Sequence, residues 1–186
     1  MQAVLPRYLL FAAIVAAGTA LDLATKSWAF RRLGMPGGQI EWIWPGRVGF
    51  QTSLNEGALF GLGQGGVPVF VAISVLAGLA ILIWLVRIRE WMLTVALAFI
   101  AAGILGNLYD RLGLHGLQWP DGLLGRQAGA PVHAVRDWIL VMIFGWPWPN
   151  FNIADSLLVC GAALLVWHAF RSEVKSEEKS DRKAET

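Results

Sequence analysis

Four long apolar segments dominate the pattern of hydrophobic and polar positions along the chain. A helix that crosses the hydrocarbon core of a bilayer needs about 20 apolar residues. Segments of this length, or close to it, extend over residues 9–30, 67–86, 91–108 and 153–170. The first is longer than the apolar part of a usual signal peptide and carries charges near its far end, so we expect it to be retained as a helix. The pattern therefore predicts four membrane-spanning helices.

The two long connections between these helices contain a smaller β element. In residues 37–66, apolar and aromatic side chains alternate on both sides of a proline-glycine turn at 45–46. This alternation predicts a hairpin with one apolar face, lying on the membrane surface. In residues 109–150, the apolar stretch 135–146 is too short to span a bilayer, so the sequence is compatible with either an interfacial helix or a strand there. The predicted fold class is an all-α membrane protein with a small β element.

Basic residues near the helix ends predict the orientation in the membrane. Eight of them lie on the side of the two chain ends and of the short connection at residues 87–90, against six in the two long connections. We therefore expect both termini in the cytoplasm and the long connections outside. The polar stretch 171–186 balances five basic with five acidic residues and has no aromatic side chain. We expect it to be a disordered, solvated cytoplasmic tail.

The composition agrees with a single membrane domain over residues 1–170. Hydrophobic residues make up 56% and charged residues 15% of the 186 positions, and the mean hydropathy is +0.54. This is too apolar for an ordinary soluble domain. The single cysteine, Cys160, cannot form an intramolecular disulfide and is expected to behave as a small apolar residue. The net charge of +2 comes without a basic cluster among aromatic residues, so we expect a lipid bilayer and no nucleic acid as partner.

Charged residues within the spanning segments are candidate functional groups, because an unpaired charge there is costly. Asp22 and Lys26 are four residues apart and share one helix face. A structural ion pair is favoured for them over direct chemistry by Lys26. Asp110 and Arg111 end the third segment, where a stabilising network is favoured over catalysis.

Two further aspartates flank the start of the fourth segment. Asp155 lies near its beginning, where the helix dipole favours a carboxylate. Asn150 or Asn152 is available as the helix cap, which leaves Asp155 one turn further in and directed between the helices. Asp137 is a second acid just outside the membrane, and two carboxyl groups held together can activate a water with one member and donate a proton with the other. From the residues alone, separate surface and capping roles are favoured over such a pair.

Five blocks that contain these polar residues are spread from the first helix to the last. They are DLATK at 22–26, NEGALFG at 55–61, GNLYDR at 106–111, VRDW at 135–138 and FNIADS at 151–156. Their sequences and their order resemble the lipoprotein signal peptidase family, also called signal peptidase II. Five blocks in the right order are hard to obtain by chance.

The resemblance implies a bundle of four transmembrane helices in the bacterial inner membrane, with both termini cytoplasmic. A β-cradle and the active site would lie at the periplasmic face. The implied activity is that of an aspartic endopeptidase, which removes the signal peptide from prolipoproteins whose lipobox cysteine carries a diacylglyceryl group. No cofactor and no metal are implied. The expected partners are lipidated prolipoproteins and membrane phospholipids, and we expect a monomer.

By the same resemblance, Asp137 and Asp155 are the catalytic pair. The polar residues expected to surround the site and hold the substrate are Asn55, Asn107, Arg111 and Asn152. Supporting roles are expected for Asp22, Lys26, Gly57 and Asp110. The arginine and the asparagines would orient the scissile carbonyl group and stabilise the charge that develops on it.

Two features depart from the family's pattern. Residues 112–134 form an insert where the family usually has a much shorter link, and Asp121 within it is an alternative to Asp137 as the first catalytic aspartate. Asp137 is preferred because a valine and a tryptophan frame it as in the family, whereas Asp121 lies in a turn sequence. The insert is either an ordered flap over the active site or a tolerated surface loop. Leu59 stands where the family often has alanine, which would narrow the pocket.

Other chemistries fit the sequence less well. A serine-lysine peptidase needs a serine beside Lys26. The candidate serines are Ser27, Ser53 and Ser156. A metal site needs clustered ligands, and the sequence has no H-E-x-x-H motif. The histidines are scattered at His115, His133 and His168. The alternative outside enzymes is a small transporter or scaffold with an intramembrane polar path. That path would use Asp22, Asp110 and Asp155.

Overall fold

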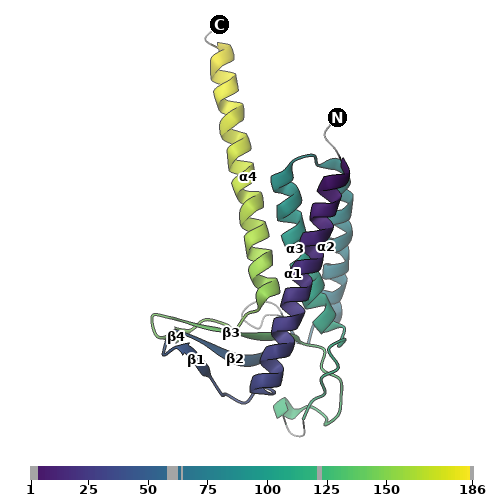
Figure 1. Ribbon diagram of the computed structural model, residues 1–186, viewed down its shortest axis with the longest axis vertical. Helices are drawn as coiled ribbons and strands as arrows, with labels where there is room; N and C mark the ends of the chain where they lie inside the picture. The colour runs from purple at the N-terminus through teal and green to yellow at the C-terminus, as the bar shows by residue number, and fades with distance from the viewer. Residues whose placement is uncertain (1–3, 58–62, 64, 121–122, 185–186) are drawn as a thin grey trace.

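The computed structural model describes residues 4–57, 63, 65–120 and 123–184 of the chain. Within these residues it contains a bundle of four helices with a four-stranded sheet at one end (Figure 1). The helices are α1 (Val4–Leu33), α2 (Val67–Arg87), α3 (Trp91–Arg111) and α4 (Ile153–Ala184). The strands are β1 (Glu41–Trp44), β2 (Val48–Asn55), β3 (Val135–Ile143) and β4 (Trp146–Pro147), and a 3-10 turn, η2, covers Leu123–Gly125. The start of α1 and the end of α4 lie at the end of the bundle opposite to the sheet.

The four predicted spanning helices are confirmed. The stretches that are long and apolar enough to cross a membrane are Leu5–Leu33, Val67–Arg87, Trp91–Arg111 and Ile153–Glu173. Large apolar side chains on these helices are exposed in the isolated chain, for example Leu9, Leu76 and Val159, as expected of surfaces that face lipid rather than water. Helix α3 extends one turn beyond the predicted residue 108, so its last turn carries polar residues of the site.

The tail requires a correction. We predicted disorder from residue 171, but α4 continues as helix to Ala184. The tail sequence is rich in Glu, Lys and Arg, which have high helix propensity, and it contains neither glycine nor proline to end the helix. The helix therefore propagates out of the apolar segment into polar sequence.

Helix α3 lies at the centre of the bundle and contacts the three other helices. Many of its buried residues are small, with alanines and glycines on the faces that meet α1 and α4. A Cβ atom on Gly103 would lie 2.5 Å from the carbonyl oxygen of Ala154, and one on Gly106 would collide with the carboxylate of Asp22. These two glycines therefore permit the close approach of α4 and of Asp22 to α3.

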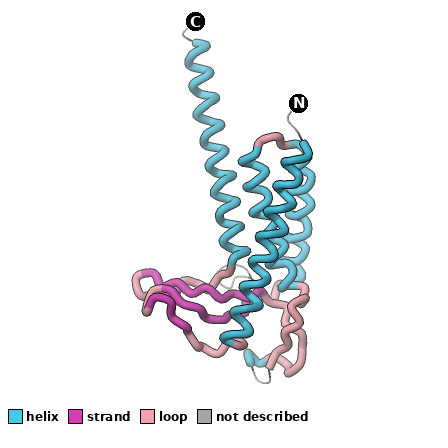
Figure 2. The backbone as a smooth tube through the Cα atoms, in the orientation of Figure 1, coloured by secondary structure: helices cyan, strands magenta, loops and turns pink. Residues whose placement is uncertain are grey.

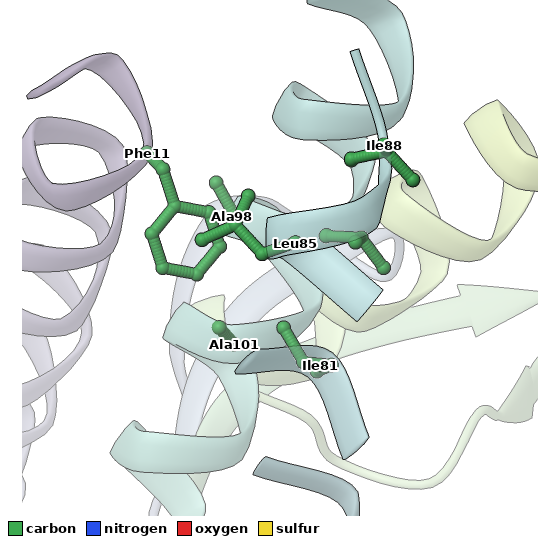
Figure 3. Close-up of a cluster of buried hydrophobic side chains, with 7 residues drawn as sticks. Phe11, Ile81, Leu85, Ile88, Ala98 and Ala101 are labelled. Carbon is green, nitrogen blue, oxygen red and sulfur yellow. The ribbon is translucent and has the colours of Figure 1, made fainter. Parts of the chain in front are cut away.

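An apolar core fills the half of the bundle away from the sheet. Figure 3 shows this cluster between α1, α2 and α3, and its labelled members are Phe11, Ile81, Leu85, Ile88, Ala98 and Ala101. The polar residues identified in the sequence lie in the other half, near the sheet. The polar residues of the candidate site thus lie at the sheet end of the bundle, whereas the opposite half is packed mainly with apolar side chains.

The sheet is antiparallel, with the strand order β1-β2-β3-β4, and its strands are magenta in Figure 2. The predicted hairpin is confirmed as β1 and β2. The stretch 135–146, for which a helix and a strand were both considered, contains the strand β3. Three rings fasten the sheet to the end of α1: Trp28 lies edge-on to Phe50 and to Trp138, with centroid distances of 5.2 and 5.8 Å. In the β2–β3 register Ser53 lies opposite Asp137.

Candidate functional site

Strand β3 is hydrogen-bonded to the residue that leads into α4, and this contact brings the two candidate acids together. The amide nitrogens of Trp138 and Ile139 donate to the carbonyl oxygen of Phe151 at 3.1 and 2.9 Å, and Phe151 donates back to Ile139 at 3.2 Å. Asp137 therefore lies beside the first turn of α4, which carries Asp155.

The first turn of α4 is closed by a reciprocal cap. The amide nitrogen of Asp155 donates to Oδ1 of Asn152 at 2.9 Å, and the amide nitrogen of Asn152 donates to Oδ2 of Asp155 at 3.2 Å. This is the arrangement of a capping box. Of the two asparagines available as cap, Asn152 is the one used, because Asn150 donates instead to the carbonyl oxygen of Gln51 at 2.7 Å. The second carboxylate oxygen of Asp155 accepts a hydrogen bond from Nδ2 of Asn107 at 2.8 Å.

Asp137 is only 2% exposed and is held by two asparagines. Nδ2 of Asn152 donates to its Oδ1 at 2.6 Å, and the side chain of Asn55 donates to the same carboxyl group. Burial raises the pKa of Asp137 well above its usual range, and the neighbouring charge of Asp155 raises it further against the effect of these hydrogen bonds. A carboxyl group that keeps its proton beside a second carboxyl group is suited to general acid catalysis.

A buried network of alternating charges lies behind this pair. Lys26 is fully buried and places Nζ 2.7 Å from Asp22, 3.1 Å from Asp110 and 2.9 Å from Oδ1 of Asn107. The ammonium group therefore lies within ion-pair distance of two carboxylates and donates one hydrogen bond, to Asn107. These contacts give Lys26 a structural place in the network, which argues against the serine-lysine alternative.

The two carboxylates bound to Lys26 each hold one side of the acid pair. Oδ1 of Asp22 accepts the amide hydrogen of Ala154 at 2.9 Å and so fixes the start of α4. Asp110 accepts the amide hydrogen of Arg136 at 2.9 Å and also binds the guanidinium group of Arg136 at 2.8 and 3.0 Å. Asp110 thereby fixes β3 immediately before Asp137.

Arg136 is a site residue that sequence reasoning missed. It is 3% exposed, and besides Asp110 it donates to Oγ of Ser27 at 3.2 Å. The sequence analysis counted Arg136 only among the basic residues of the outer connection. A signal was present, because a charged residue inside an apolar strand requires a buried partner.

Arg111 lies near the two acids. Its Nη2 donates to the carbonyl oxygen of Gly57 at 3.0 Å, and its guanidinium group lies 5.2 Å from the ring centre of Phe70. Its Nε is buried and has no hydrogen-bond partner among the described residues. The predicted substrate-binding residues Asn55, Asn107, Arg111 and Asn152 thus lie together around the acids, and Gly57 supports Arg111.

Two of the remaining candidates, Asp121 and Leu59, lie outside the described residues. The hydroxyl group of Ser156 donates to the carbonyl oxygen of Asn152, four residues earlier in the chain, at 3.1 Å. Within the described part of the chain, no group of three or more His, Cys, Asp or Glu side chains is arranged to hold a metal ion.

Four helices apolar enough to span a bilayer, with two neighbouring carboxyl groups at one end of the bundle, are the features of a multi-pass membrane protein with a buried acidic site. The family model of signal peptidase (SPase) II matches residues 14–171. A lipoprotein signal peptidase of Rhodopirellula baltica is 50% identical over 170 residues, which cover 88% of this chain and 73% of that protein. One of Bifidobacterium longum subsp. infantis is 32% identical over 160 residues, which cover 86% and 78%.

A solved structure described as a bacterial membrane enzyme agrees with these relatives. It superposes with a TM-score of 0.70 at 25% identity, and the match covers 88% of this chain and 89% of that one. The chain therefore belongs to the signal peptidase II family of lipoprotein signal peptidases. The expectations of a membrane-bound aspartic peptidase and of a four-helix bundle with a small sheet are confirmed.

Proposed function

We propose that this protein cleaves the signal peptide from diacylglyceryl-modified prolipoproteins, with a water molecule activated by Asp137 and Asp155. Family membership supplies the reaction class. The observation that carries the mechanism is the position of Asn152, whose side chain donates to Asp137 and whose backbone and side chain both bind Asp155. One residue thus holds the two carboxyl groups beside each other.

The environments of the two acids favour different roles. Asp155, whose carboxylate lies at the positive end of the α4 dipole, accepts a proton from water as the water oxygen attacks the scissile carbonyl carbon. Asp137, whose raised pKa keeps it protonated, donates its proton to the carbonyl oxygen. Asp137 then takes a proton back from the tetrahedral intermediate while Asp155 protonates the departing nitrogen. The C–N bond breaks and both acids return to their starting states.

Arg111 is suited to bind the peptide before and during this reaction. Its Nε has no hydrogen-bond partner among the described residues, and its guanidinium group lies within electrostatic range of Asp155 and Asp137. A donor held by protein contacts can orient a substrate carbonyl group and stabilise negative charge without reorganisation. Asn55 and Asn107 would keep the acids in place while the peptide enters.

The lipid requirement gives the test of the proposed function. Purified protein should release the signal peptide from a prolipoprotein that carries the diacylglyceryl group and leave the unmodified form largely intact, because the acyl chains hold the scissile bond at the depth of the acids. Mass spectrometry of the products measures both reactions. Equal cleavage of the unmodified prolipoprotein would contradict the lipid requirement, and the absence of cleavage from both would contradict the proposed function.

We further propose that both termini are cytoplasmic and that the site faces the periplasm. The distribution of basic residues supports this orientation, and so does the location of the sheet at the end of the bundle opposite to the two chain termini. Phospholipids would cover the exposed apolar faces of the helices. A monomer would suffice, because both acids belong to one chain.

Cysteine labelling in spheroplasts, before and after lysis, tests the orientation. Phe144, at the β3–β4 turn, is 96% exposed, and Arg89 lies in the short connection at the opposite end. In a Cys160→Ser background, Phe144→Cys should react with a membrane-impermeant maleimide in spheroplasts, whereas Arg89→Cys should react only after lysis. The reverse pattern would overturn the orientation.

A further inference from the structure

The insert folds into a lobe beside the candidate site. In residues 112–134, the side chains of Trp119, Val132 and Ala134 are buried together. Backbone hydrogen bonds pair the two sides of the lobe, from Trp119 to Ala130 at 2.9 Å and from Val132 to Leu117 at 3.0 Å. Figure 2 shows these loops at the same end of the bundle as the sheet. The described part of the insert is therefore ordered.

A cleft of about 370 Å³ lies between described residues of this lobe and the described residues Glu56, Gly65 and Val67. One wall includes Glu56 and Val67. The other wall is formed by Trp119, Arg126, Gln127, Ala130, Pro131 and His133 of the insert. Glu56 and Arg126 form an ion pair, and the guanidinium group of Arg126 lies 5.7 Å from the ring centre of Trp119. The lining thus combines charged and polar groups with one large ring.

Three consecutive residues connect this cleft to the acids. Asn55 donates to Asp137, Glu56 lines the cleft, and the carbonyl oxygen of Gly57 accepts a hydrogen bond from Arg111. On the insert side, Nδ1 of His133 lies 3.1 Å from the carbonyl oxygen of Arg111. The cleft and the candidate active site therefore share a wall.

We propose that this cleft binds the polypeptide segment that follows the lipidated cysteine of the substrate. The inference rests on the proposed function. The apolar signal peptide and the acyl chains remain in the bilayer, so the downstream segment must leave the acids toward water, and the cleft lies beyond residues 55–57 at that end of the bundle. Its charged and polar lining suits an extended polar peptide and not an acyl chain.

Arg126 is the residue best placed to bind that segment. Its side chain is 46% exposed, whereas Glu56 is 15% exposed, so the arginine can turn toward an incoming peptide while the glutamate remains in the wall. A guanidinium group has several donors in a planar fork, which suits carbonyl and carboxylate oxygens of a peptide. Substrate length beyond the cysteine should therefore affect binding through Arg126.

Two diacylglyceryl-modified substrates with the same signal peptide and lipobox test this proposal. The short one ends one residue after the modified cysteine, and the long one continues with about ten polar residues, a length chosen to exceed the cleft. With the wild-type protein, the long substrate should have the lower KM. Arg126→Gln should raise the KM of the long substrate by about tenfold, the worth of one hydrogen bond to a charged group, and leave kcat and the short substrate unchanged. Gln127→Trp, which fills the cleft without removing the ion pair, should have the same selective effect.

Arg32→Gln is the matched control. Arg32 forms an exposed ion pair with Glu41 at 2.6 Å, at the end of α1 and outside the cleft, and its loss should affect neither substrate selectively. Equal KM values for the two substrates in the wild type would overturn the proposal. Equal increases in the KM of both substrates in Arg126→Gln and Gln127→Trp would also overturn it. The insert would then act only by supporting residues 55–57 and would not bind the downstream segment. Failure of the proposed function is distinct, because the wild type would then cleave neither substrate.

Discussion

Asp155→Asn and Asp137→Asn should each reduce kcat by about 10³-fold for a diacylglyceryl-modified prolipoprotein, within the range that a general acid or base contributes. The amide retains the size of the carboxyl group and one acceptor oxygen, so the capping box and the contact with Asn152 can largely persist. It cannot exchange a proton with water or with the scissile carbonyl group. Initial rates measured by gel shift of the lipidated substrate, with thermal unfolding in detergent to verify the fold, give the comparison.

Asp121→Asn is the matched control, because Asp121 is the other aspartate considered for the first catalytic position. We expect it to retain activity close to that of the wild type. Loss of activity in Asp121→Asn together with retained activity in Asp137→Asn would identify Asp121, in the insert, as the first catalytic aspartate. Full activity in Asp155→Asn would contradict the two-aspartate mechanism.

The pH dependence separates the roles of the two acids. Burial, followed by the charge of Asp155, raises the pKa of Asp137, so Asp137 is protonated below that raised value and ionised above it. A proton donor is active only in its protonated form. The wild-type kcat should therefore fall as the pH rises through the pKa of Asp137. A kcat that rises there would instead make Asp137 the proton acceptor and Asp155 the proton donor.

The helices and the hairpin could be predicted because their signals are local. Twenty consecutive apolar residues have few alternatives to a membrane span, and alternation around a proline-glycine turn specifies a hairpin. The limits of α4 could not be predicted in the same way. The composition of residues 171–186 predicted a disordered, solvated tail. Composition does not determine where a helix that has already begun will end.

The meeting of Asp137 and Asp155 could not be predicted from local pattern. It depends on hydrogen bonds between β3 and Phe151, which join segments separated by a turn and a short strand. Without the family resemblance, separate roles for the two acids were the better interpretation. The cap at Asn152 was predicted as one of two options, because the chemistry of a helix N-terminus is local.

The role of Asp110 illustrates what only the three-dimensional structure supplies. From the sequence we expected Asp110 and Arg111 to form a stabilising network at the end of the third helix. In the structure the charged partners of Asp110 are instead distant in sequence: Lys26 from α1 and Arg136 from β3. The charges of this network alternate in space and not along the chain. Arg136 was therefore missed, although it is the residue that Asp110 holds next to Asp137.

Lys26→Met should destabilise the protein by about 3–5 kcal/mol, the usual cost of removing one partner from a buried ion pair. Methionine keeps most of the length of the side chain, but Asp22 and Asp110 would then remain buried without their shared cation. Because these carboxylates hold the start of α4 and the start of β3, activity should fall together with stability. Thermal unfolding in detergent and cleavage rates measured on the same preparations test both effects.

Arg32→Met distinguishes this effect from the loss of any ion pair. Arg32 and Glu41 are 54% and 40% exposed, so water can solvate either group after the other is removed, and the unfolding temperature should stay close to that of the wild type. A Lys26→Met protein that unfolds at the wild-type temperature would show that Asp22 and Asp110 are neutralised by protonation at little cost. If stability falls while the cleavage rate of the folded fraction is unchanged, the network supports the fold without positioning the acids. Loss of both is expected, because Lys26 also binds Asn107, which donates directly to Asp155.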